Sequence, residues 1–117
     1  MSVSTTERLR HIRDEIEFII KTCVGREKAE VLQDETAQRA VIRSLEIIGE
    51  AAKALPESFR EAHPEIEWRK VGAMRDRLIH GDFTVNWDTV WDVVTVHIPQ
   101  LDVTVRTALD NMTEEPT

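Results

Sequence analysis

Hydrophobic residues recur at steps of three and four along most of the chain, which is the period of an amphipathic α-helix. The first stripe follows Ser4, which resembles a capping box together with Glu7, and it ends before Gly25. The second stripe follows Asp34, a good N-cap residue, and should end before Pro56. The stripes consist of Leu9, Ile12, Ile16, Ile19 and Cys23, and of Ala37, Val41, Leu45, Ile48 and Ala52. We expect two long helices that each bury one face.

Shorter helical segments are expected between and after these two. Residues 26–33 can add a turn or two before the second long helix. The segment PESFREAH, 56–63, should form a short helix that finishes before Pro64, because the residue preceding a proline is pushed out of helical space. The next helix should start near Trp68 and run to about His80 before the chain turns away at a glycine.

The final segment, 87–109, is rich in Val and Thr, whose propensity alone favours a strand. Its periodicity decides for a helix, since the apolar positions follow one another at an average step of about 3.5 residues. These positions are Trp87, Val90, Trp91, Val94, Ile98, Leu101, Val105 and Leu109. Pro99 should kink this helix rather than end it.

The size of the chain limits it to one domain. Its 117 residues are 41% hydrophobic, which provides for one modest core. We expect an all-α bundle of four to five helices over residues 1–109, followed by a flexible acidic tail at 110–117. Because a small domain buries a small share of its unfolded surface, a dimer interface would add stability.

The composition also bears on the compartment. Cys23 is the single cysteine, so no internal disulfide can form, and its place on the first apolar stripe suits a reduced thiol. No apolar run approaches the roughly 18 residues of a membrane-spanning helix, and the N-terminus becomes charged where a signal peptide would become apolar. We expect a cytoplasmic protein without membrane association.

The charge is unevenly distributed. A formal net charge of −7 argues against a protein that coats nucleic acid or membranes through a broad basic surface. Basic residues nevertheless gather in the segment WRKVGAMRDRLIHGDF, 68–83. They are Arg69, Lys70, Arg75 and Arg77, and the segment closes near His80. Any contact with nucleic acid is therefore expected to be local.

Arg75 and His80 are candidates for chemistry within this segment. They are five residues apart, about 140° around an ideal helix, so their side chains converge only if the helix ends there, as Gly81 suggests. Such a pair suits phosphoryl chemistry, because the imidazole can move protons while the guanidinium holds the phosphate. The spacing alone also arises by chance, and a histidine at a helix end can be a simple cap.

Three motifs stand in order along the chain: IGEAAK at 48–53, HPEIEW at 63–68 and RDRLIHGDF at 75–83. Together they resemble the HEPN superfamily, specifically the HepT-like toxins paired with minimal nucleotidyltransferase antitoxins, and the similarity extends over nearly the whole chain. The resemblance implies a HEPN-type helical bundle and a metal-independent endoribonuclease of a toxin–antitoxin system. It also implies that Arg75 and His80 form the catalytic site at the interface of a homodimer.

Other residues of the basic segment are candidates for supporting roles. Asp76 stands where relatives often carry Asn or Asp, and it could orient the catalytic pair or be an ordinary exposed carboxylate. Arg77 and Asp82 are further possible supporting residues. Arg69 and Lys70 are candidates for binding the RNA substrate.

The sequence departs from the family pattern just after the histidine. The family motif continues with any residue and then a tyrosine, whereas here Gly81 and Asp82 follow, and the sequence contains no Tyr. In the family, the cognate MNT-type nucleotidyltransferase attaches AMP to that tyrosine to silence the toxin. Two alternatives to an active toxin remain: a weak or inactive HEPN subunit that binds the nucleotidyltransferase, and a helical adaptor without a link to nucleotides.

Glu46 and Glu50 form an i, i+4 carboxylate pair near Arg43. Such a pair can be a metal site or an acid–base dyad, but a solvated, salt-bridged helix face is the favoured interpretation.

Two other groups of residues carry side chains that can bind metals or nucleobases. His11, His63 and His97 share no ligand-like spacing, so we expect no metal and no cofactor. Trp87 and Trp91 could stack bases beside the basic segment, although their helical spacing favours packing in the core or in a dimer interface.

Overall fold

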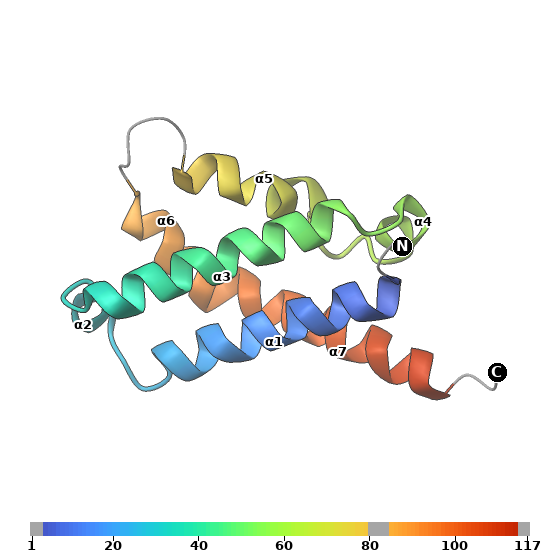
Figure 1. The fold of residues 1–117 in the computed structure, drawn as a ribbon, viewed down its shortest axis with the longest axis horizontal. Coiled ribbons are helices and arrows are strands. Elements are labelled where there is room, and N and C mark those ends of the chain that lie inside the picture. Colours follow the sequence, from blue (N-terminus) through green and yellow to red (C-terminus); the bar gives the residue numbers. More distant parts are fainter. Residues whose placement is uncertain (1–3, 80–84, 115–117) are drawn as a thin grey trace.

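Two long antiparallel helices form the centre of the protein. The computed structural model describes residues 4–79 and 85–114, and these residues contain helices and no strand. Helices α1 (Thr5–Cys23) and α3 (Glu35–Lys53) pack side by side (Figure 1). Both predicted N-caps are confirmed, because the Ser4 side chain accepts a hydrogen bond from the Glu7 amide and the Asp34 side chain accepts one from the Ala37 amide.

The shorter helices lie where the turn signals predict them. Helix α2 (Lys28–Val31) joins α1 to α3, and helix α4 (Glu57–Ala62) ends before Pro64. Helix α5 (Trp68–Ile79) then packs along α3 (Figure 1). At the end of α1 the chain turns through Gly25 with φ of 71°, a conformation that glycine adopts without strain.

The last helical run passes through Pro99 without ending. It consists of α6 (Trp87–Asp92), a π-helical segment η1 (Val93–His97) and α7 (Ile98–Glu114). Pro99 has no N–H to donate and its ring crowds the preceding turn, so a widened turn just before it keeps the run continuous. The run continues beyond the predicted end near Leu109, so residues 110–114 of the expected tail are helical.

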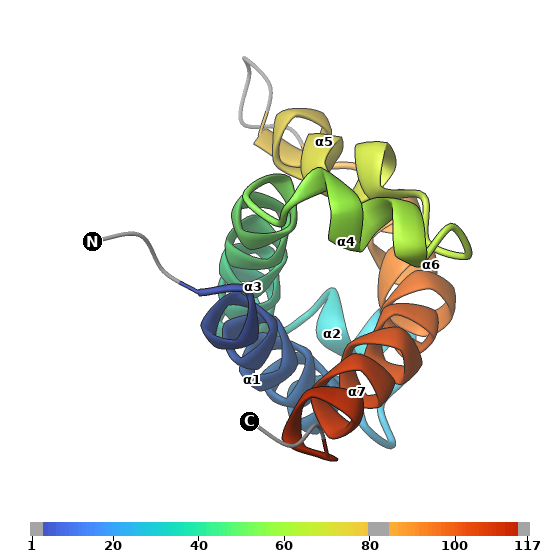
Figure 2. The ribbon, with the colours of Figure 1, turned by 90° about the vertical axis from the view of Figure 1, so that its right-hand side faces the viewer.

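The elements surround one shared apolar core (Figure 2). The stripes predicted for α1 and α3 are buried, except that Cys23 is half-buried. Burial raises the pKa of the Cys23 thiol, which favours the neutral form, while nearby Arg26 acts in the opposite direction. In the last run the predicted stripe is likewise buried, with Trp87 and Trp91 half-buried at its start. Each fully buried Leu or Ile contributes roughly 1.5–3 kcal/mol by removal from water.

Within residues 4–79 and 85–114, no helix is both long and apolar enough to cross a bilayer.

Candidate functional site

Helix α5 includes Arg75 of the predicted site, and its first residue, Trp68, is held in place by two contacts. Trp68 is buried, and its indole N–H donates a hydrogen bond of 2.9 Å to the carbonyl of His63. Its ring meets Phe59 edge-on at a centroid distance of 5.8 Å. These two contacts fix where α5 begins.

The connection before α5 is also tied to α7. The buried Thr104 hydroxyl donates a hydrogen bond of 2.9 Å to Glu65 Oε2. The backbone N–H of Glu65 itself and this hydroxyl hold the pKa of the Glu65 carboxyl below its usual range. The start of α5 is thus held from two sides.

The middle of α5 approaches α3 closely at a glycine. Gly72 is buried, and a Cβ atom in its place would stand 2.8 Å from Cγ of Lys53 on α3. The Lys53 stem therefore passes directly over α5, and its Nζ lies 4.0 Å from Asp76 Oδ2. The IGEAAK and RDRLIHGDF motifs, which are far apart in sequence, meet at this crossing.

The two predicted catalytic residues are described to different degrees. The backbone of Arg75 lies within α5, between Gly72 and the end of the helix. The side chains of Arg75 and Arg77, and all of His80 and Asp82, lie outside the described residues. The convergence of arginine and histidine therefore stays a prediction.

Asp76 is exposed, and its charged neighbour is Lys53. An ion pair at 4.0 Å between exposed side chains is worth little in water, typically about 0–1 kcal/mol. Lys53 was not singled out from the sequence as a neighbour of this segment. The one feature of the sequence that could have indicated this neighbour is Gly72, one helical turn before Asp76, because a glycine leaves room for a long side chain from another helix.

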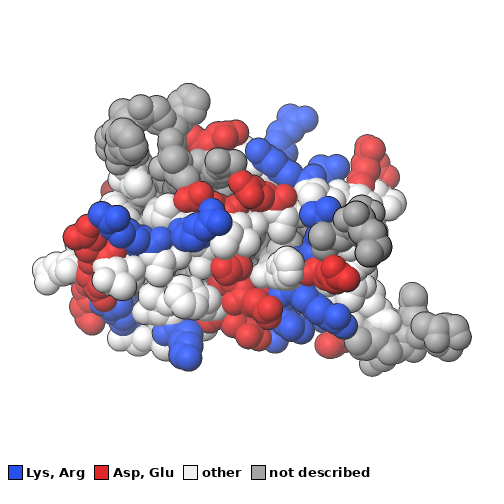
Figure 3. Space-filling model, in the orientation of Figure 1, with Lys and Arg blue, Asp and Glu red and all other residues white. Residues whose placement is uncertain are grey.

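The predicted RNA-binding residues Arg69 and Lys70 are exposed on the first turn of α5. Lys70 Nζ lies 2.9 Å from Glu67 Oε2, and this hydrogen bond holds the pKa of the Glu67 carboxyl below its usual range. Figure 3 shows basic side chains above the start of α5, interspersed with acidic ones. On this face Lys and Arg side chains are spread among Asp and Glu and form no single broad basic surface.

The remaining predicted side chains have ordinary partners. Glu46 pairs with Arg43 at 3.5 Å, which confirms a salt-bridged helix face there. His63 Nδ1 lies 3.6 Å from Glu65, and His97 Nε2 lies 3.4 Å from Asp92. In the described part of the chain, no three His, Cys, Asp or Glu side chains gather as metal ligands would.

Comparison with known proteins places the chain in a family. The model of the family described as Ribonuclease HepT-like matches residues 12–108, a range that includes all of α3 and α5. The chain belongs to the HepT-like ribonuclease family. The resemblance noted in the three motifs is confirmed.

Individual relatives agree with this assignment. Two are named putative RNases: one from Caldanaerobacter subterraneus is 43% identical over 86% of this chain and 90% of its own length, and one from Methanocaldococcus jannaschii is 47% identical over 60% of this chain and 58% of its own. A protein of Thermococcus cleftensis named as a probable ribonuclease HepT is 51% identical over 60% of this chain and 64% of its own. No solved structure matches the chain.

Proposed function

We propose that this protein is a metal-independent endoribonuclease that acts as the toxin of a toxin–antitoxin pair. The observation that carries the proposal is the HepT-like match over residues 12–108, which spans the RDRLIHGDF segment. The described part of this segment lies on α5, a helix anchored at its start by Trp68 and supported along α3. A rigid helix of this kind suits a site whose reacting groups must be held in place.

In the proposed reaction, His80 transfers protons and Arg75 binds the phosphate. One imidazole takes the proton of a ribose 2′-hydroxyl, whose oxygen attacks the neighbouring phosphorus, and an imidazolium gives a proton to the leaving 5′-oxygen. The products are a 2′,3′-cyclic phosphate and a free 5′-hydroxyl. The guanidinium of Arg75 holds the phosphate and stabilises the charge that develops on it.

This division of roles is simplest in a homodimer. Two histidines, one from each subunit, then face one phosphate, and one acts as base while the other acts as acid. The small core and the exposed charged face of α5 are consistent with a second copy of the chain completing the site. Arg69 and Lys70, on the first turn of α5, would lie beside such a cleft and bind the flanking phosphates.

A toxic ribonuclease requires an inhibitor, for which we propose a cognate minimal nucleotidyltransferase acting in the cytoplasm. Asp82 stands at the position of the family's tyrosine, and a carboxylate has no phenolic hydroxyl to accept AMP stably. We therefore propose inhibition by a partner that covers the cleft. The second candidate function, a weak or inactive subunit that binds this partner, is favoured by the same missing tyrosine.

Cleavage of RNA by the purified protein tests the proposal. Wild type should cut single-stranded RNA in the presence of a chelator and leave cyclic phosphate ends. Arg75→Ala and His80→Ala should each abolish cleavage and the growth arrest that follows expression. The matched control is His11→Ala, an exposed histidine of α1, which should cleave as wild type does.

Two results would count against this function. Cleavage that survives His80→Ala would remove the proposed mechanism, and cleavage stopped by the chelator would contradict a metal-independent one. Binding of the nucleotidyltransferase by a wild-type protein that cuts no RNA would select the inactive subunit instead.

A further inference from the structure

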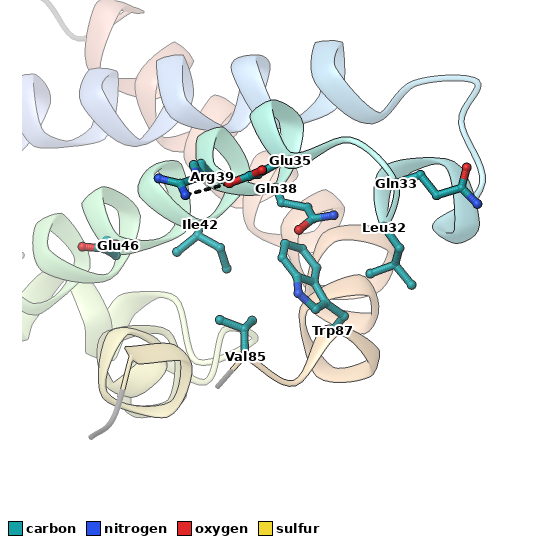
Figure 4. A pocket seen from close by; sticks show the side chains of 9 residues that line it. All are labelled: Leu32, Gln33, Glu35, Gln38, Arg39, Ile42, Glu46, Val85 and Trp87. Carbon is teal, nitrogen blue, oxygen red and sulfur yellow. Dashed lines mark hydrogen bonds and ion pairs between the residues drawn. The ribbon is translucent and has the colours of Figure 1, made fainter. Parts of the chain in front are cut away.

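A hollow of about 750 Å³ lies between α2, α3 and the start of α6 (Figure 4). Its apolar wall comes from Leu32, Ile42, Val85 and Trp87. Val85 and Trp87 follow the RDRLIHGDF motif by two and four residues. The start of α6 and the C-terminal end of α5 lie at the same end of the molecule (Figure 1). The hollow therefore lies at the end of the molecule where α5 ends, and none of the residues that line it belongs to the predicted catalytic pair.

Trp87 contributes the aromatic ring of the wall. It is half-buried, and its indole reaches into the hollow toward Gln38 of α3 (Figure 4). Its backbone is fixed, because the Asn86 side chain caps α6 by accepting a hydrogen bond of 3.2 Å from the Thr89 amide. An ion pair between Lys28 of α2 and Asp88 of α6 also connects two walls of the hollow. The ring is thus a preformed aromatic face that the core does not fully cover.

Gln38 adds directional polar groups to this aromatic face. Its Nε2 donates a hydrogen bond of 3.0 Å to the carbonyl of Val31, which orients the amide at the wall of the hollow. Beyond this bond, a glutamine amide carries a second N–H and an acceptor oxygen. A donor and an acceptor held side by side are the groups that pair with the edge of a nucleobase.

The charges around the hollow cancel locally. Arg39 is held by Glu35 through two hydrogen bonds of 2.7 and 3.1 Å, and Glu46 pairs with Arg43. A wall with matched charges gives little attraction for a phosphate, whose binding depends on unmatched positive charge. It does suit a neutral, flat and partly polar group.

We propose that this hollow binds one unpaired base of the RNA substrate, with Trp87 stacking on the base and Gln38 hydrogen-bonding its edge. This inference rests on the proposed function, since the base would belong to a nucleotide near the phosphate that is cut. The hollow would select single-stranded RNA, because a base inside a duplex cannot present its face to a side chain. It would also set a preference for the base at one position relative to the cut.

Binding of a non-cleavable RNA tests this subsite independently of catalysis. The probe is a single-stranded oligonucleotide with 2′-O-methyl groups, titrated against wild type, Trp87→Leu and Trp87→Phe. Trp87→Leu should bind roughly tenfold more weakly, because loss of one base–aromatic stack has an effect of this order. Trp87→Phe keeps an aromatic face and should stay close to wild type. The matched control is Trp91→Leu, a half-buried tryptophan of the same helix outside the hollow, which should bind as wild type does.

A single abasic site moved along the oligonucleotide then identifies the bound base. Wild type should lose affinity at one position, and Trp87→Leu should lose no more at that same position, since the stacking partner is already gone. Equal binding by wild type and folded Trp87→Leu would overturn the proposal, and so would failure of wild type to bind the oligonucleotide.

The remaining outcomes separate this proposal from its rivals. A change in sedimentation of Trp87→Leu with no dependence on the abasic position would identify the hollow as a protein interface and overturn the subsite. Coupling between Trp87 and one base in a protein that never cleaves RNA would support the subsite while contradicting the proposed function.

Discussion

The side chain of Lys53 lies directly over Gly72, so that a Cβ atom at Gly72 would stand 2.8 Å from Lys53 Cγ. Glycine inside a helix normally weakens it, by roughly 0.5–1 kcal/mol relative to alanine. Here the missing side chain leaves room for the Lys53 stem to lie between α3 and α5. This contact lies one helical turn before Asp76 and close to the backbone of Arg75.

A double-mutant cycle can measure this contact. Gly72→Ala in a Lys53→Ala background should stabilise the protein by roughly 0.5–1 kcal/mol, because helix propensity improves and no Lys53 stem is in the way. In wild type the same change should stabilise less or destabilise, since the stem must move to another rotamer. Chemical denaturation of the four proteins gives the coupling energy. Equal effects in the two backgrounds would show that the helices do not depend on this crossing.

Asp34 should make the stability of α3 depend on pH. The hydrogen bond from the Ala37 amide, together with Arg26, holds the pKa of the Asp34 carboxyl below its usual range. Its charged form therefore stabilises the folded state above the unfolded pKa of about 3.9, and this gain is lost as the pH falls through the lower folded pKa. Asp34→Asn keeps a good N-cap without the charge, so its melting temperature should approach that of wild type as the pH falls from 6 to below 3.

The matched variant for this test is Asp34→Ala, which removes the cap as well as the charge. It should melt below Asp34→Asn at every pH in this range. A constant difference between wild type and Asp34→Asn across the range would contradict the assignment of the charge effect to Asp34.

Dimerisation through α5 is the next prediction. Wild type should sediment as a dimer at micromolar concentration, and Ala73→Arg, a half-buried position on α5, should shift it toward the monomer by placing a charge in the interface. Ala29→Arg, an exposed position on α2, is the control and should leave the dimer intact. A monomeric wild type would contradict the composite active site.

Control by occlusion predicts an unmodified protein. After co-expression with the proposed nucleotidyltransferase partner, the intact mass of the purified chain should equal that of the unmodified sequence. An acyl-adenylate on Asp82 would be a mixed anhydride that water hydrolyses. Inhibition should instead reverse on dilution, as mass action requires. A lasting gain of one AMP unit on any residue would show that a covalent switch operates and would end the occlusion model.

The sequence predicted most of the secondary structure, and for a specific reason. Helical periodicity and capping are local properties, so Ser4 and Asp34 could be assigned as N-caps from their own neighbours. The apolar stripes followed from the same period, and burial confirmed them on α1, α3 and the last run. Membership of the HepT-like family was also readable, because its three motifs are short and ordered.

Local rules were less successful where distant segments meet. The widened turn before Pro99 and the continuation of α7 to Glu114 differ from a simple kink and an end near Leu109. Ile98, Leu101 and Val105 are buried in this run, and Met112, beyond the predicted end, still packs against the core. Propensity within the run carries no information on those contacts.

The sequence by itself determined the helices, the core stripes and the segment that holds Arg75 and His80. Only the tertiary structure decided that Lys53 crosses α5 at Gly72 and that Trp87 and Gln38 share one hollow with matched charges at its rim. The physical reason is that periodicity and capping depend on neighbours within one helical turn, whereas these contacts join residues from different helices. Such contacts are fixed by how the helices pack against the common core, and no spacing along the chain encodes that.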